Sequence, residues 1–491
     1  MKKIIPLIIF LLLLPCFSQS SPEMQNGEIM HSLPSPENIS MFLLSLPHKI
    51  ERRNFPAVNL TLELAVRTGN IDFLYERKAA WLKDAFLEFY ELEGININQK
   101  SLENLFSEID ALPYELREAL ALLIYTLNDV KILCENSIHN LREGEIKFLK
   151  EHNEYPFTLT QLLRDIMMEK IGGIFLPNLQ LFSNGASSDL TPILKKIDME
   201  KMVEGNILMI DTIQKVIPVL KKYNNLSSKK LLEDPSSLIY IGGTSPTSYK
   251  GNYSIIVDLG GNDDYYAQPK EQGVSLLIDM SGNDRYIGKK AHAFLGIDIL
   301  YDEEGNDVYT ASDFSQAYAC AGISLLIDNS GDDIYKAKTH SQGSATAKGI
   351  AILADLDGND TYISLNSSQA YANGFGCSCL LDISGDDFYS SNSYSQGSST
   401  GGGISFLLDF LGNDEYVSDH NSQGAGEGWA EKKMSIGSLI DLSGNDTYVS
   451  KKEAQGFGKN LGIGVLIDLF GDDKYRAIDS SQAYGLSLIH I

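Results

Sequence analysis

The chain has 491 residues, of which 43% are hydrophobic, and a formal net charge of −25 at pH 7. This length exceeds the size at which one hydrophobic core usually stops growing, so we expect at least two domains. The charge is concentrated in the second half, where residues 251–491 contain 34 acidic and 14 basic side chains, a balance of −20. Such a field attracts cations and repels phosphate, which argues against nucleic acid as a partner.

Residues 1–20 have the order of a signal peptide. Two lysines precede an apolar run from Ile4 to Leu14, and a short polar tract ends at Ser20. The run is shorter than the roughly 20 residues that span a bilayer, so no transmembrane segment is expected in the mature chain. Cys16 follows a proline instead of the small residue of a lipoprotein signal, which disfavours a lipid anchor. We therefore expect a secreted or cell-surface protein.

Residues 35–235 predict an α-helical domain, flanked by linkers at residues 21–34 and 236–254. The clearest helix lies in residues 113–123, where Leu116, Leu120 and Leu123 recur at helical spacing after Pro113. This part has no repeat period and no cluster of histidines or cysteines, so its sequence does not indicate what the domain does. The second linker is rich in turn-forming residues.

Residues 255–491 contain nine copies of the motif Asp-x-x-Gly-Asx-Asp-x-Tyr, where Asx is Asn or Asp. The first aspartate recurs at intervals of 21, 23, 26, 27, 27, 27, 32 and 27 residues, and fixed periods of this size are typical of solenoids. A glutamine follows each tyrosine by seven residues, from Gln272 to Gln482, except in the second copy, which has Ala293 there. A tenth first aspartate is due near residue 495, beyond Ile491, so we expect the repeat domain to be truncated at its C-terminus.

Each unit contains three strand-sized pieces: an apolar run before the first aspartate, the segment around the tyrosine and the segment around the glutamine. This pattern predicts an all-β right-handed parallel β-helix with three strands and about 27 residues per coil, whereas a propeller blade needs four strands and about 40 residues. Recurring residues then stack about 4.8 Å apart. We expect a leucine column two positions before the first aspartate, a stack of tyrosine rings and a ladder of glutamine amides.

Some of the predicted strands are apolar on both faces. In Leu325-Leu326-Ile327, three consecutive residues are apolar, although a strand with one solvated face should alternate. Either the chain bends there or the outer face of the sheet is covered. The cover would be the helical domain, a second protomer or a partner.

The acidic turn resembles the calcium-binding nonapeptide of haemolysin-type (RTX) repeats, Gly-Gly-x-Gly-x-Asp-x-U-x, in which U is a large apolar residue. In the second copy Gly282 matches the third glycine, Asp284 the metal-binding aspartate and Tyr286 the residue U. Asp279 and Met280 stand in place of the first two glycines, and each coil has only one such segment. The resemblance covers about eight residues per copy, and it implies bound Ca²⁺.

Each motif contributes a first aspartate and, five residues later, a second aspartate. Stacked at strand spacing, like charges repel by roughly 3 kcal/mol at an effective dielectric of about 20, and calcium with its oxygen ligands would offset this repulsion. Turn capping alone also explains aspartate and glycine here, so turn capping, capping with calcium and other chemistry all remain open. The candidate metal ligands are Asp258, Asp263, Asp279, Asp284, Asp302, Asp307, Asp328, Asp333, Asp355, Asp360, Asp382, Asp387, Asp409, Asp414, Asp441, Asp446, Asp468 and Asp473.

Catalytic groups, if present, are expected where the repeat breaks, because a catalytic site is singular. Such positions are mostly edge or loop residues, and we assign no catalytic residue; the irregular positions are His292, Asp298, Glu303, Glu304, Glu427, Trp429 and Glu431. We expect a non-enzymatic, acidic, exported module that binds a protein or glycan partner on its β-helix face. The alternative is a polysaccharide-active β-helix lyase or hydrolase, which rests on analogy of fold.

Overall fold

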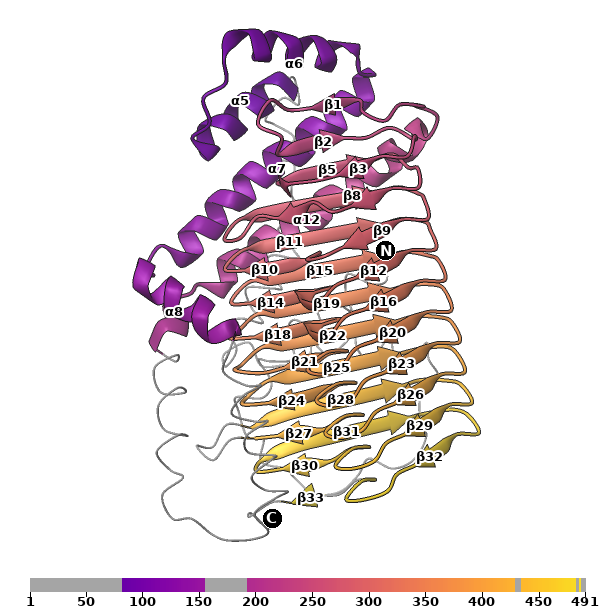
Figure 1. Ribbon diagram of the computed structural model, residues 1–491. Coiled ribbons are helices and arrows are strands. Elements are labelled where there is room, and N and C mark those ends of the chain that lie inside the picture. Colours follow the sequence, from indigo (N-terminus) through magenta and orange to yellow (C-terminus); the bar gives the residue numbers. More distant parts are fainter. Residues whose placement is uncertain (1–81, 155–191, 429–433, 483–484, 487–491) are drawn as a thin grey trace, which may run out of the picture. The chain divides into compact units, whose positions relative to one another are not determined.

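The computed structural model describes residues 82–154, 192–428, 434–482 and 485–486. The chain divides into two compact units, residues 1–77 and 78–491, and every described residue belongs to the second. In this unit, helices between residues 82 and 223 precede a parallel β-solenoid whose regular coils are 27 residues long (Figure 1). The predicted fold class is confirmed. The expected signal peptide and first linker lie outside the described residues, within which no helix is long and apolar enough to cross a membrane.

The helices follow the apolar spacing of the sequence. The longest, α7 (Tyr114–Ile138), begins after Pro113 and buries Leu116, Leu120 and Leu123 as predicted. Pro113 lacks a backbone N–H, but this costs nothing at a helix start, where that group would have no partner within the helix. The helices are α5 (Leu82–Glu93), α6 (Gln99–Ala111), α7, α8 (Glu143–Glu154), α12 (Met199–Leu220) and the 3₁₀ helix η3 (Lys221–Tyr223).

Three sheets form the walls of the solenoid, and all their pairings are parallel except that of β1 with β2. Sheet 1 consists of β1 (Leu232–Glu233), β2 (Ile239–Ile241), β5 (Ile255–Asp258), β8 (Val274–Asp279), β11 (Ile297–Asp302), β15 (Ile323–Asp328), β19 (Ile350–Asp355), β22 (Cys377–Asp382), β25 (Ile404–Asp409), β28 (Ser435–Asp441) and β31 (Gly462–Asp468). Sheet 2 carries the tyrosines and consists of β3 (Ser248–Tyr249), β6 (Asp264–Tyr265), β9 (Arg285–Ile287), β12 (Val308–Thr310), β16 (Ile334–Lys336), β20 (Thr361–Ile363), β23 (Phe388–Ser390), β26 (Glu415–Val417), β29 (Thr447–Val449) and β32 (Lys474–Arg476).

Sheet 3 closes each coil after the glutamine. It consists of β10 (His292–Phe294), β14 (Tyr318–Cys320), β18 (Ser344–Thr346), β21 (Tyr371–Ala372), β24 (Ser398–Thr400), β27 (Gly426–Glu427), β30 (Gly458–Lys459) and β33 (Gly485–Leu486). Two short pairs complete the strands, β4 (Asn252–Tyr253) with β7 (Gln268–Pro269) and β13 (Asp313–Ser315) with β17 (Thr339–Ser341). The segment at residues 236–254, expected as a linker, contains β2, β3 and β4.

Stacked side chains fill the interior between the sheets. The tyrosines from Tyr249 to Tyr475 form a continuous stack in which successive ring centroids lie 4.5–5.0 Å apart and the rings are within 8° of parallel. The leucine column beside them, from Leu277 to Leu439, is fully buried. Both predicted columns are confirmed, and their burial stabilises the stacking of successive coils.

The glutamine column differs from the prediction. Gln342 Nε2 donates to two backbone carbonyls, Tyr335 O at 3.0 Å and Ile363 O at 3.1 Å, so the amides tie one coil to the next through the backbone instead of forming a side-chain ladder. Gln272 is exposed. In the second copy, Lys290 and not Ala293 lies beside Gln316, the next glutamine of the column. The chain of the second copy is shorter between its tyrosine, Tyr286, and the position that the glutamine takes in other coils.

The outer face of sheet 1 is covered by helices in the first coils. Helix α7 contacts β8, and α12 contacts β15. A Cβ atom on Gly205 of α12 would lie 3.4 Å from Ile297 Cδ1, and the outward-facing Ile297 and Ile299 are buried. An ion pair of 2.5 Å between Glu93 of α5 and Lys270 also joins the helices to the solenoid. Of the covers considered above, the helical region is the one that the structure shows for these coils.

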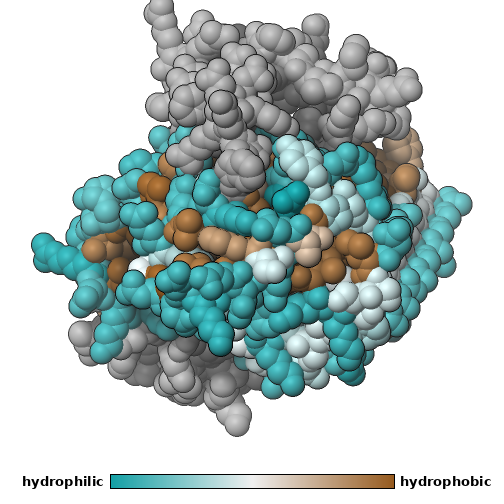
Figure 2. Space-filling model, turned by 90° about the horizontal axis from the view of Figure 1, so that it is seen from above, coloured by the Kyte–Doolittle hydropathy of each residue, from teal (hydrophilic) through white to brown (hydrophobic). Residues whose placement is uncertain are grey.

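The first edge of the solenoid is capped. Helix α6 contacts β1, which turns antiparallel to β2 and lies beyond the parallel strands (Figure 1). Viewed from this end, the surface is mostly hydrophilic and is crossed by a hydrophobic band (Figure 2). A solenoid needs such a cap, because an open edge presents unpaired backbone groups.

Candidate metal centre

The two aspartate columns line the inside of the turn between sheets 1 and 2. The first aspartate ends each strand of sheet 1, as Asp355 ends β19, and the second aspartate, such as Asp360, lies just before the tyrosine strand. All the predicted ligands from Asp258 to Asp446 are at most 2% exposed. Asp468 and Asp473 in the last coil are partly exposed. The turn therefore holds its carboxyl groups inside the solenoid, where an unpaired charge is costly.

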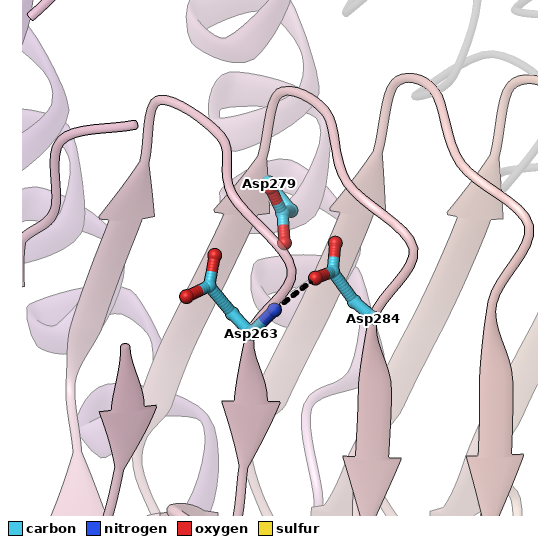
Figure 3. A group of neighbouring side chains, drawn as sticks. All are labelled: Asp263, Asp279 and Asp284. Atoms are coloured by element: carbon cyan, nitrogen blue, oxygen red, sulfur yellow. Dashed lines mark hydrogen bonds between the residues drawn. The ribbon is translucent and has the colours of Figure 1, made fainter. Parts of the chain in front are cut away.

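One oxygen of each second aspartate joins two coils. The backbone N–H of Asp333 donates to Asp360 Oδ1 at 2.7 Å, and the N–H of Asp360 donates to Asp387 Oδ1 at 2.6 Å. The same bond links Asp263 to Asp284 in Figure 3. The other oxygen, Oδ2, has no hydrogen-bond partner among the described residues from Asp263 to Asp446.

Each first aspartate is held by tyrosine hydroxyls. The Tyr335 hydroxyl lies 2.7 Å from Asp355 Oδ2 in the next coil and 3.2 Å from Asp328 Oδ2 in its own coil. A hydroxyl has one hydrogen, so it donates to one carboxylate, and the shorter distance identifies the next coil. The opposite oxygen, Oδ1, is buried without a partner in Asp302, Asp328, Asp355, Asp382, Asp409 and Asp468.

Carboxyl groups of the two columns converge in groups of three. Each group combines the second aspartate of one coil with both aspartates of the next, and its ligand atoms lie within 4.8 Å of one another. In Figure 3 the carboxylate of Asp279 points between those of Asp263 and Asp284. Five groups are Asp263/Asp279/Asp284, Asp284/Asp302/Asp307, Asp307/Asp328/Asp333, Asp333/Asp355/Asp360 and Asp360/Asp382/Asp387, and three more occur in the described residues. We call these groups the aspartate triads.

The triads cannot hold their full negative charge alone. Burial, together with the charge of Asp387, raises the pKa of Asp360 to about 8, and burial with the charge of Asp328 raises the pKa of Asp333 to about 11. The carboxyl groups of Asp328 and Asp333 are close enough to share a proton. Each triad must therefore bind protons or a cation to compensate its charge.

The donor set of a triad suits a hard divalent cation. All its ligand atoms are carboxylate oxygens, which calcium and magnesium prefer. The set contains none of the nitrogen or sulfur ligands that are typical of zinc sites. Calcium–oxygen distances of about 2.3–2.6 Å allow two ligand oxygens to lie up to roughly 5 Å apart, and the oxygens of a triad lie within this limit. The buried oxygens without a hydrogen-bond donor can bind either a shared proton or a cation. These groups of buried aspartates could thus hold a metal ion.

The glycine of each motif leaves room beside the triads. A Cβ atom on Gly331 would lie 1.4 Å from the carbonyl oxygen of Gly305, so no other residue allows the coils to approach this closely. On the outside, a shallow depression is lined by this glycine, Gly358 and Asn359. A Cβ atom on Gly358 would lie 3.0 Å from Asp360 Oδ1, so the buried carboxylates lie just behind the glycines. The depression therefore lies on the solvent side of the triads.

A further column, which the sequence analysis did not single out, lies on the exposed side of the same turn. The backbone N–H of Asn359 donates to Asp332 Oδ1 at 2.9 Å, and that of Asp386 donates to Asn359 Oδ1 at 2.9 Å. These residues occupy the Asx position of the motif, and its restriction to Asn and Asp was the signal for this role. The turn is consequently bonded from coil to coil on both its buried and its exposed sides.

Two of the residues that break the repeat are engaged within the coils. His292 is buried, its ring Nδ1 lies 2.8 Å from Phe314 O, and its backbone N–H donates to Asp298 Oδ2 at 2.6 Å. Burial lowers the pKa of His292 to about 3 and raises the pKa of Asp298 to about 7. The histidine is thus neutral at physiological pH and acts as a packed core residue.

The remaining irregular residues are scattered. Glu303 is buried, pairs with Lys221 and accepts a hydrogen bond from the Tyr301 hydroxyl. Glu304 is exposed, and Glu427 lies 3.8 Å from Lys459. Trp429 and Glu431 lie outside the described residues. The described members of this set do not form a facing pair of acids.

No protein-family model matches this chain, and neither the curated proteins nor the solved structures include a match to it.

Proposed function

We propose that the protein is an exported, non-enzymatic β-solenoid that calcium stabilises, and that it works as an acidic structural or binding module. The observation that carries the proposal is the row of buried aspartate oxygens without hydrogen-bond partners. A divalent cation bound in a triad compensates two of its three negative charges. Calcium fits better than magnesium, because it accepts irregular sets of oxygen ligands and magnesium demands a near-ideal octahedron.

A bound calcium ion would cross-link successive coils. Each triad takes ligands from two successive coils, so an ion bound there joins them directly. The unfolded chain has no such arrangement, and the binding free energy therefore adds to the stability of the fold. This role needs no catalytic group, and His292, Asp298 and Glu303 make structural contacts within the chain.

Thermal unfolding of the full chain with and without calcium tests the proposal. One site saturated at 100 times its Kd adds about 2.7 kcal/mol, so several filled triads should raise the Tm by more than about 10 °C over the protein in EDTA. Magnesium at the same concentration should raise it much less. Equal Tm values in calcium and EDTA would remove calcium from the account.

Two variants of one coil supply the matched control. Asp355→Asn removes a charged ligand from a triad, whereas Asp357→Asn changes an exposed aspartate two residues away that belongs to none of the triads named above. The first variant should lose part of the calcium-dependent rise in Tm, and the second should retain all of it. An equal loss in both would indicate a general effect of charge and not a site.

Export is part of the proposal and has its own test. The support is the order of charged, apolar and polar segments in residues 1–20. Expression of the full chain in a bacterium, followed by fractionation and N-terminal sequencing, should yield a chain outside the cytoplasm that begins near residue 21. A cytoplasmic chain that retains its first residues would contradict export.

The exposed side of the turn is the surface through which we propose that the module meets a partner. A ladder of exposed Asn and Asp side chains follows the turn coil by coil, from Asn262 to Asp472. Such a ladder suits a cationic protein surface or a glycan that offers hydroxyl donors. Binding of a panel of basic proteins and neutral glycans to the immobilised chain, at low and high salt, tests this choice, and no binding to any of them would contradict it.

A further inference from the structure

Neighbouring triads share an aspartate. Asp333 belongs to the triad of Asp307 and Asp328 and also to the triad of Asp355 and Asp360. The same holds for Asp284, Asp307 and Asp360, whereas each first aspartate, and Asp263 at the start of the row, belongs to one of the triads named above. The triads therefore form a continuous row and not a set of separate sites.

The shared aspartate has only one free oxygen. Asp333 Oδ1 accepts the backbone N–H of Asp307 at 2.6 Å, and Asp333 Oδ2 is buried without a partner. Ions in both flanking triads would have to bind this one Oδ2 atom. Two calcium ions that share one oxygen lie at most roughly 5 Å apart, and ions in adjacent coils would be about 4.8 Å apart. The calcium–oxygen–calcium angle would therefore have to be almost straight.

Full occupancy would also place like charges close together. Two divalent cations one coil apart repel each other inside a protein, where screening by water and salt is weak. Ions in alternate triads are twice as far apart, and each has both of its second aspartates to itself. Both the ligand count and the repulsion thus favour filling every other coil.

We infer that calcium fills the row of triads alternately, so that occupancy of one triad weakens binding at the two beside it. The inference rests on the proposed function, in that it takes the triads to be calcium sites. It adds that the sites are coupled through shared aspartates. The repeat continues the row through the later aspartate pairs up to Asp473, so eight triads should bind about four ions tightly and further ions only weakly.

Two substitutions in one triad separate coupled sites from independent ones. Asp355→Asn disables a single triad and leaves runs of three and four, which still accommodate four alternate ions. Asp333→Asn disables two adjacent triads and leaves runs of two and four, which accommodate three. Both substitutions replace a buried carboxylate by an amide of nearly the same size, so the pair is matched in chemistry and in place.

Isothermal titration of the metal-stripped full chain with calcium chloride, together with equilibrium dialysis to count bound ions, tests the inference. The expected result is a tight phase of four ions in the wild type and in Asp355→Asn, and of three ions in Asp333→Asn. A single phase of eight equivalent ions would overturn alternate filling and leave the proposed function standing. A tight phase that shrinks equally in both variants would overturn it as well, and the absence of any binding would refute the proposed function together with this inference.

Discussion

The substitution Tyr335→Phe removes one hydroxyl from the centre of the solenoid and leaves the packing intact. The Tyr335 ring lies between those of Tyr309 and Tyr362, with centroid distances of 4.6 and 4.8 Å, and a phenylalanine ring preserves both contacts. The hydroxyl itself donates to Asp355 Oδ2 at 2.7 Å. Since Asp355 Oδ1 already has no partner, the variant leaves this buried carboxyl group with neither oxygen bonded to its tyrosine donor.

The expected loss follows from this geometry. Hydrogen bonds to charged groups contribute about 1.5–3 kcal/mol, and a buried acceptor left unsatisfied costs a similar amount. We therefore expect Tyr335→Phe to lower the free energy of unfolding by about 2–3 kcal/mol at constant calcium concentration. Tyr475→Phe is the control, because the Tyr475 hydroxyl also donates to a first aspartate, that of its own coil, at 2.8 Å from Asp468 Oδ2, but Tyr475 is 43% exposed. Water can replace that hydroxyl, and the expected loss is below about 1 kcal/mol.

Urea unfolding followed by circular dichroism measures both variants. The midpoint for Tyr335→Phe should fall with little change in the slope m, which depends on the surface exposed on unfolding. Hydrogen exchange should place the loss of protection in the coils around Tyr335, because each coil of a solenoid contacts only its neighbours. Equal midpoints for Tyr335→Phe and the wild type, or equal losses in Tyr335→Phe and Tyr475→Phe, would refute the role assigned to the buried hydroxyls.

Three more predictions concern the core, the turn and pH. Leu353→Ala should cost about 2–5 kcal/mol in urea unfolding, because it opens a cavity in the fully buried leucine column, and a cost below 1 kcal/mol would contradict that packing. Gly331→Ala should reduce both thermal stability and the number of bound calcium ions, since its Cβ would overlap the Gly305 carbonyl oxygen, and an unchanged Tm would contradict the close approach of the coils. In EDTA, the folded chain binds more protons than the unfolded chain between pH 3.8 and the raised pKa of groups such as Asp360, about 8, so stability should be greatest near pH 4 and fall as pH rises to 8. Urea midpoints at pH 5 and pH 8 check the sign, and a higher midpoint at pH 8 without calcium would contradict it.

The repeat fold could be predicted because its columns follow directly from the period. The spacing between first aspartates sets which residues stack, and the constant seven residues from aspartate to tyrosine place Tyr335 opposite Tyr362 without knowledge of the intervening path. The glutamine column could not be followed in the same way through the early copies. Counting from the tyrosine pointed to Gln272 and Ala293, but these coils have shorter corners, and Lys290 takes the place in register.

The candidate site was predicted only in its components. Sequence spacing identified both aspartate columns, and the resemblance to RTX repeats pointed to calcium. The sequence did not reveal that one oxygen of each second aspartate accepts a hydrogen bond from the backbone of the preceding coil, as Asp360 does from Asp333. This bond depends on the path of the turn in three dimensions. The sharing of aspartates between triads depends on the same three-dimensional path, and so it emerges only from the structure.

A crystal structure of the full chain grown in calcium, with anomalous data, would show whether calcium occupies the aspartate triads. We expect an anomalous peak inside the turn, about 2.3–2.6 Å from Asp333 Oδ2, Asp355 Oδ1 and Asp360 Oδ2 or from the corresponding oxygens of a neighbouring triad. Triads that show no peak in any coil, with their carboxyl oxygens hydrogen-bonded to one another instead, would contradict it.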